Sequence, residues 1–202
     1  MTDKSSDRFD QKPVLEQPKG MSTEVLGMFI FIISEAILFV TLLVILFWVR
    51  GGQFTEWPPP GQPRLPIAIT GLNTLFLLFS GFTMYRAYHS IKKNETMLLT
   101  RWLMITCILG VVFLTVQGFE WIRLMDFGLS MTTSLYGAMF YSIIGLHAIH
   151  VLITILILLY LWVRSTSKVY TAKQHTGITL GYMFWSFVVL IWPILYITVY
   201  LV

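Results

Sequence analysis

The chain has 202 residues, of which 56% are hydrophobic and 12% are charged, and its formal net charge is +4 at pH 7. An ordinary soluble domain carries roughly 25% charged residues, so this composition excludes a typical soluble globular protein. The excess of cations does not indicate a nucleic-acid partner, because the basic residues are confined to a few segments between long apolar stretches.

Residues 1–21 form the first segment, and they are mostly polar. They mix charged residues with Ser, Gln and Pro and offer little apolar surface to bury, so we expect a mobile N-terminal tail. The apolar segment behind this tail is not expected to be a signal peptide, because it is about 23 residues long and no small-residue cleavage site follows it.

The rest of the chain contains five apolar segments that are long enough to cross a bilayer. A membrane-spanning helix needs about 20 such residues. The segments cover about residues 27–49, 66–91, 102–123, 136–163 and 177–201. The sequence therefore predicts an all-α integral membrane protein, with residues 22–202 forming a bundle of five transmembrane helices.

The basic residues between these segments predict the orientation in the membrane. Four Lys or Arg residues lie in the tail, four in residues 86–101 and three in residues 164–173, whereas the opposite side carries three. Cytoplasmic loops are enriched in Lys and Arg. We therefore expect the N-terminus inside and the C-terminus outside.

Four ionisable residues lie within the apolar segments: Glu35, Glu120, His147 and His150. Such residues are rare, since a charge at the centre of a membrane helix costs roughly 2.5–3.5 kcal/mol on insertion scales. At 1.5 Å per residue, Glu35 and His150 reach similar depths. His147 lies three residues before His150 on one helix face, whereas Glu120 is nearer the outer end of its helix. We predict a buried polar network of Glu35, His147, His150 and Glu120, in which Glu35 pairs with His150 and His147 lies nearby.

This cluster has two interpretations. The side chains could relay protons or bind a metal, or they could form hydrogen bonds that fix helix packing, and the spacing favours packing. Haem ligation by two histidines needs an imidazole from a second helix at matching depth, but His89 and His175 lie near inner helix ends. No CxxC, GxSxG or nucleotide-binding fingerprint occurs. We therefore predict no catalytic residue and no metal ligand in this chain.

Several stretches carry a resemblance to a known family. In order, they are FIISEAILFV with Ser34 and Glu35, WPPP with Trp57, QGFEW with Gln117 and Glu120, and YGAMFYSIIGLHAIHV with Tyr136, His147 and His150. Over residues 22–202 the chain resembles subunit III of the haem–copper terminal oxidases, the cytochrome c oxidase subunit III family, in its short five-helix bacterial form.

The resemblance implies an accessory, non-redox subunit of a proton-translocating oxygen reductase in the aerobic respiratory chain of a bacterial inner membrane. Haem and copper are then expected in subunit I and no cofactor in this chain. The chain would pack on subunit I, contact subunit II, bind phospholipid, and support assembly, proton uptake and stability during turnover. Ser34, Gln117, Trp57 and Tyr136 are candidates for lipid contact or packing, and Glu35 is the intramembrane acid of the family.

One stretch departs from the family. Its last helix usually reads YWHFVDxVW, whereas this chain has FWSFVVLIW, with Ser186 and Val189 in place of His and Asp. This difference keeps open an accessory subunit of a nitric-oxide reductase. An independent proton-coupled carrier using Glu35 and Glu120 is a further alternative, disfavoured because the sequence has no internal repeat.

Overall fold

The computed structural model describes residues 22–53, 63, 65–132 and 134–201. These residues form five α-helices, namely α1 Thr23–Gln53, α2 Ile67–Lys92, α3 Thr96–Asp126, α4 Leu135–Thr166 and α5 Thr176–Tyr196, and α5 continues as the π-helix η1 Ile197–Leu201. All five are long and apolar enough to cross a membrane. The predicted all-α membrane fold is confirmed, while the predicted tail lies outside the described residues.

The helices extend beyond the apolar segments that predicted them. The prediction for α3 began at residue 102, but the helix begins at Thr96 and ends at Asp126. At 1.5 Å per residue its 31 residues span about 46 Å, which is longer than a hydrocarbon core of about 30 Å. The helix ends therefore extend beyond the apolar core, through turns of mixed composition that include Arg101 and Asp126.

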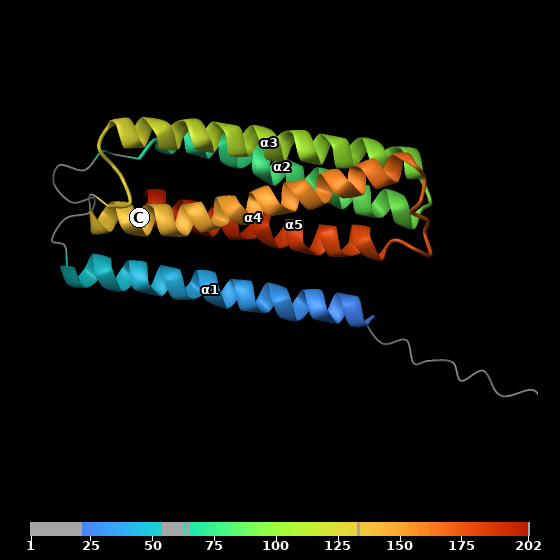
Figure 1. Cartoon of the computed structure of the whole chain (residues 1–202), viewed down its shortest axis with the longest axis horizontal. Helices are drawn as coiled ribbons and strands as arrows, with labels where there is room; N and C mark the ends of the chain where they lie inside the picture. The colour runs from blue at the N-terminus through green and yellow to red at the C-terminus, as the bar shows by residue number, and fades with distance from the viewer. Residues whose placement is uncertain (1–21, 54–62, 64, 133, 202) are drawn as a thin grey trace, which may run out of the picture.

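The helices run in alternating directions along one common axis, and α1 stands at one side of the bundle (Figure 1). The main contacts of α1 are with α5 and α4. Of its most apolar stretch, 11% is buried inside the protein, compared with 33% to 44% for the other four helices. α1 is thus the helix least embedded in the bundle.

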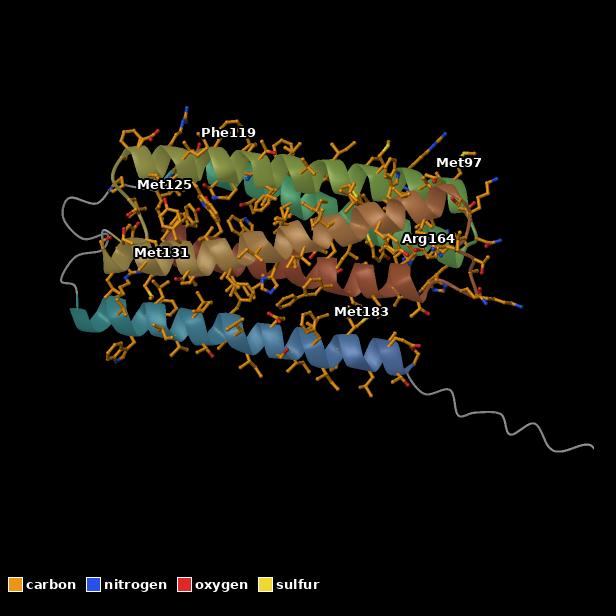
Figure 2. All side chains as sticks on the ribbon, viewed as in Figure 1. Met97, Phe119, Met125, Met131, Arg164 and Met183 are labelled. Atoms are coloured by element: carbon orange, nitrogen blue, oxygen red, sulfur yellow. The ribbon has the colours of Figure 1, made fainter. Side chains whose placement is uncertain are left out.

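Helices α2 to α5 enclose the core, which contains large aromatic side chains. Trp185 and Trp192 of α5 are fully buried, and the Trp192 ring packs edge-on against Phe113 of α3 at 5.0 Å between centroids. Apolar side chains also cover the outside. Figure 2 shows Met97 and Phe119 pointing away from the bundle, and they are 68% and 64% exposed. A bilayer accommodates such a surface.

Buried polar side chains of α2 join this helix to its neighbours. The Asn73 amide donates to the Phe113 carbonyl at 3.0 Å, the Trp192 indole donates to the Thr74 hydroxyl at 2.8 Å, and the hydroxyls of Thr83 and Thr106 lie 2.8 Å apart. Interhelical hydrogen bonds of this kind fix helix packing in membranes, where lipid is as apolar as the side chains.

The stretch of α5 that departs from the family pattern, with Ser186 and Val189, includes a helix–helix contact. Val189 is 4% exposed. A Cβ atom added to Gly81 of α2 would lie 3.0 Å from the Cγ1 atom of Val189. The valine therefore packs against the backbone of α2 rather than facing lipid.

Gly110 provides a test of this packing. An added Cβ would lie 2.9 Å from the buried Trp185 ring and 3.1 Å from Ile155, whereas an added Cβ at Gly118 meets nothing within 4 Å. We expect Gly110→Ala to destabilise the protein by about 1–3 kcal/mol through overpacking. Thermal unfolding in detergent measures this loss, with Gly118→Ala as the matched control. Equal stability of the two variants would contradict the close contact.

Candidate functional site

Glu35 and His150 meet between α1 and α4. The His150 Nε2 atom lies 2.9 Å from the Glu35 Oε2 atom, and the two side chains are 12% and 17% exposed. Glu35 lies near the middle of α1 and His150 near the middle of α4. The contact therefore joins the least embedded helix to the core at membrane depth.

The hydrogen bonds of His150 show how protons are distributed in this pair. Its Nδ1 atom lies 2.8 Å from the Leu146 carbonyl oxygen, which can only accept, so Nδ1 carries a hydrogen. A neutral His150 then has an acceptor at Nε2, and Glu35 must be the protonated donor. A cationic His150 donates instead to the Glu35 carboxylate. In both cases one shared proton keeps the pair neutral overall, which suits a site within a membrane.

Aromatic rings surround the pair. Phe39, one turn after Glu35 on α1, is 1% exposed, and its centroid is 5.3 Å from that of His150. The Phe184 ring of α5 lies 6.2 Å from His150 on another side. Because these rings exclude water, the hydrogen bond between Glu35 and His150 lies in a low local dielectric, where it is stronger than in water.

His147 has a different partner. Its Nε2–H donates to the Val188 carbonyl of α5 at 3.1 Å, and its ring lies 4.8 Å from that of Trp192. The prediction put His147 in one network with Glu35. A three-residue step rotates a side chain by about 60° around a helix, so His150 faces α1 while His147 faces α5. The predicted network is therefore divided between two interfaces.

Glu120 is remote from the pair. It is 6% exposed, and its carboxylate lies 3.6 Å from Arg123, whose side chain is 67% exposed. Such a long pair with a solvated or headgroup-exposed arginine contributes little. Glu120 lies in the last two turns of α3, apart from the Glu35–His150 pair with which we grouped it from the sequence.

The other candidate residues have separate surroundings. The Ser34 hydroxyl donates to the Phe31 carbonyl of its own helix at 2.7 Å. The Gln117 amide donates to the Tyr200 hydroxyl at 3.0 Å. Tyr136 is buried in the first turn of α4, and Trp57 lies outside the described residues.

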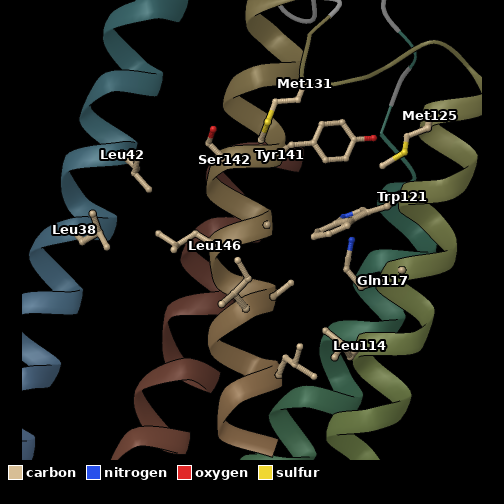
Figure 3. Close-up of a pocket in the computed structure, with 15 residues that line it drawn as sticks. Leu38, Leu42, Leu114, Gln117, Trp121, Met125, Met131, Tyr141, Ser142 and Leu146 are labelled. Atoms are coloured by element: carbon tan, nitrogen blue, oxygen red, sulfur yellow. The ribbon is translucent and has the colours of Figure 1, made fainter.

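An apolar groove of about 900 Å³ opens between α1, α3 and α4. Figure 3 shows Leu38 and Leu42 on one side, facing Leu114 and Trp121 across α4. Sequence reasoning missed this groove, because its walls are ordinary apolar residues from three helices. In the part of the chain that the structure describes, no three His, Cys, Asp or Glu side chains are grouped so that they could hold a metal ion.

Five membrane-length helices with a partly buried acid–histidine pair define a multi-pass membrane protein. A sequence model of the family described as cytochrome c oxidase subunit III matches residues 16–202. Cytochrome c oxidase subunit 3 of Synechocystis sp. is 31% identical over 176 residues, or 87% of this chain and 74% of that protein.

Two further relatives cover similar lengths. Cytochrome c oxidase subunit 3 of Thermostichus vulcanus is 34% identical over 88% of this chain and 86% of that protein. The probable cytochrome c oxidase subunit 3 of Nocardia farcinica is 31% identical over 93% and 91%. The chain belongs to the cytochrome c oxidase subunit III family, and the predicted resemblance is confirmed.

The contact between Glu35 and His150 predicts a measurable coupling energy. Hydrogen bonds within membranes are worth about 0.6 kcal/mol on average and up to about 1.7 kcal/mol. We expect a coupling in this range from a double-mutant cycle of Glu35→Ala and His150→Ala, measured by unfolding in mixed micelles. Glu35→Gln is the control, since its amide can still donate to Nε2. Additive losses in the cycle would show that the two residues do not interact.

Proposed function

We propose that the chain is an accessory, non-redox subunit of a haem–copper terminal oxidase in a bacterial inner membrane, with its N-terminus inside and its C-terminus outside. It packs on subunit I, which holds the haem and copper, and also contacts subunit II. Membership of the subunit III family supports this assignment. The structural observation that carries it is a lightly packed α1 attached to the core through the Glu35–His150 pair.

The exposed side of α1 supports a role in assembly. Its large apolar side chains include Ile37, Val40, Val44 and Trp48, which are 59% to 71% exposed. Such a surface needs lipid or another membrane helix against it. A partner subunit that packs here would add the contacts that α1 lacks within its own chain.

We attribute the support of proton uptake to the position of α1 rather than to a proton path through this chain. The Glu35–His150 pair is enclosed by Phe39 and Phe184, and Glu120 is on another helix with a different partner. The Glu35–His150 pair therefore fixes the register of α1, whose exposed side forms the surface for contact with subunit I. Stability during turnover follows from the same attachment.

The groove between α1, α3 and α4 is where we place bound phospholipid. From Leu114 to Met125 it follows α3 over eleven residue-to-residue steps, or about 16 Å, which suits most of an acyl chain. The buried Trp121 indole N–H has no hydrogen-bond partner among the described residues, and it lies near the outer end of α3. Tryptophan is enriched at membrane interfaces, and the Trp121 ring lines the groove at this level.

The assembly role is tested by purifying the tagged chain from native membranes in mild detergent. We expect a haem-bearing subunit to co-purify, visible in the reduced-minus-oxidised spectrum. Glu35→Ala should lower the haem recovered per tagged chain while oxygen consumption per haem is unchanged, because α1 loosens but no redox centre is altered. Glu35→Gln, which keeps a hydrogen-bonding group, should behave like the unaltered chain.

Two results would contradict this role. A colourless chain that purifies alone and stays folded would show that it does not belong to an oxidase. Loss of oxygen consumption by Glu35→Ala in a fully assembled complex would make Glu35 a direct participant in proton transfer.

The lipid site is tested by filling the groove. Gly118 lines it with open space beyond its Cα atom, so Gly118→Leu should displace an acyl chain. Native mass spectrometry of the purified complex should then show loss of a bound phospholipid. Gly27→Leu is the matched control, since Gly27 also faces open space but lies at the inner end of α1. Unchanged lipid retention in Gly118→Leu would place the lipid elsewhere.

A further inference from the structure

A second polar cluster lies where α2, α3 and η1 meet. Thr70 and Asn73 of α2 are each 1% exposed, and Gln117 of α3 is 2% exposed. Tyr200 of η1 is also buried and receives the hydrogen bond from Gln117. The cluster is separate from the Glu35–His150 pair, which lies between α1 and α4.

The hydrogen bonds of the two amides are half complete. Asn73 donates its Nδ2–H to the Phe113 carbonyl at 3.0 Å, and Gln117 donates its Nε2–H to the Tyr200 hydroxyl at 3.0 Å. The Phe113 carbonyl can only accept, which fixes the orientation of the Asn73 amide. The Gln117 amide has its nitrogen toward Tyr200. Asn73 Oδ1, Gln117 Oε1 and Thr70 Oγ1 have no hydrogen-bond partner among the described residues.

The three residues that carry these atoms lie in one region of the protein. Thr70 and Asn73 are three residues apart on the same face of α2. Asn73 bonds the carbonyl of Phe113, which is one turn before Gln117 on α3. The Tyr200 hydroxyl accepts from Gln117 and can donate its own hydrogen to Thr70 Oγ1, which leaves the Thr70 O–H able to donate. Side chains from α2 and α3 therefore lie around the Tyr200 hydroxyl.

Leaving these groups unpaired would be costly. A buried carbonyl or hydroxyl without a partner forfeits the hydrogen bonds that it makes with water in the unfolded chain. The two carbonyl oxygens need hydrogen-bond donors, and the Thr70 hydroxyl can itself donate. The missing partner must supply two hydrogens and accept one.

We propose that this cluster is a binding site for one internal water molecule. The water donates to Asn73 Oδ1 and to Gln117 Oε1 and accepts from the Thr70 hydroxyl. Buried waters usually make about three hydrogen bonds to groups that are otherwise unsatisfied. The bridge joins α2 to α3 and, through Tyr200, fixes η1 against them.

A metal ion fits the cluster less well. A hard cation needs at least six oxygen ligands and usually carboxylates. The carboxylate of Glu120, three residues after Gln117 on α3, lies 3.6 Å from Arg123. Neutral amide and hydroxyl oxygens suit a neutral ligand, and water supplies the donors that they lack.

Radiolytic hydroxyl-radical labelling of the purified complex, read by mass spectrometry, tests the site. Radicals formed from bound water oxidise adjacent side chains, so Tyr200 should be oxidised although it is buried. Met84, which is fully buried and intrinsically more reactive, should remain at background. Asn73→Leu should reduce Tyr200 oxidation to that background. Thr106→Val, which removes the bond to Thr83 between the same helices, should leave it unchanged.

Tyr200 oxidation no higher than that of Met84, or unaffected by Asn73→Leu, would overturn the proposal. A cryo-EM map of the unaltered complex gives a second measurement that does not depend on the variant folding. We expect density within hydrogen-bonding distance of Asn73 Oδ1, Gln117 Oε1 and Thr70 Oγ1. An empty site there, or a density ringed by six oxygens at cation-binding distances, would also overturn it.

Discussion

The hydrogen bond between Glu35 and His150 is the interaction on which the position of α1 depends. Helices in a bilayer gain little from burying apolar surface against one another, because lipid tails offer the same environment. Apolar packing alone therefore allows a loosely held helix to slide or rotate. Glu35 and His150 are 2.9 Å apart. If α1 moved so that they separated, an acid and an imidazole would be left without partners in hydrocarbon. This penalty selects one register and one rotation for α1.

The remaining helices are held by polar contacts of another kind. Hydroxyl, amide and indole groups join α2 to α3 and α5, as at Asn73, Thr74 and Thr83. None of these groups carries a charge, and they lie on the side of the core away from α1. The protein is thus a four-helix core to which a fifth helix is attached by an ionisable pair. The groove between α1 and α3 follows from this arrangement, because α1 packs mainly on α5 and α4.

The sequence predicts the number and order of the helices well, since an apolar run of bilayer length has few alternatives. Depth arithmetic also put Glu35 and His150 at the same level, and their side chains meet in the structure. The start of α3 was misplaced by six residues because the helix continues through residues 96–101, where Thr and Arg interrupt the apolar run. The partner of His147 could not be found from depth, since it depends on how α4 is rotated. The α2 hydrogen bonds were missed because Asn and Thr carry no charge, although Thr70, Asn73 and Thr74 already mark one face.

The altered residues of α5 explain why so much depends on one pair. Where the family usually has Asp, this chain has Val189, which packs closely against Gly81. Close apolar packing can replace a buried polar group without loss of stability, but it does not specify register as a polar pair does. α1 meets α5 through aromatic rings, with Phe31 5.4 Å from Phe184 and Phe39 6.3 Å from Phe187. Apolar contacts are non-directional, so these rings specify the position of α1 along its axis less sharply than a hydrogen bond does. The register of α1 is therefore set from α4, through His150, and not from α5.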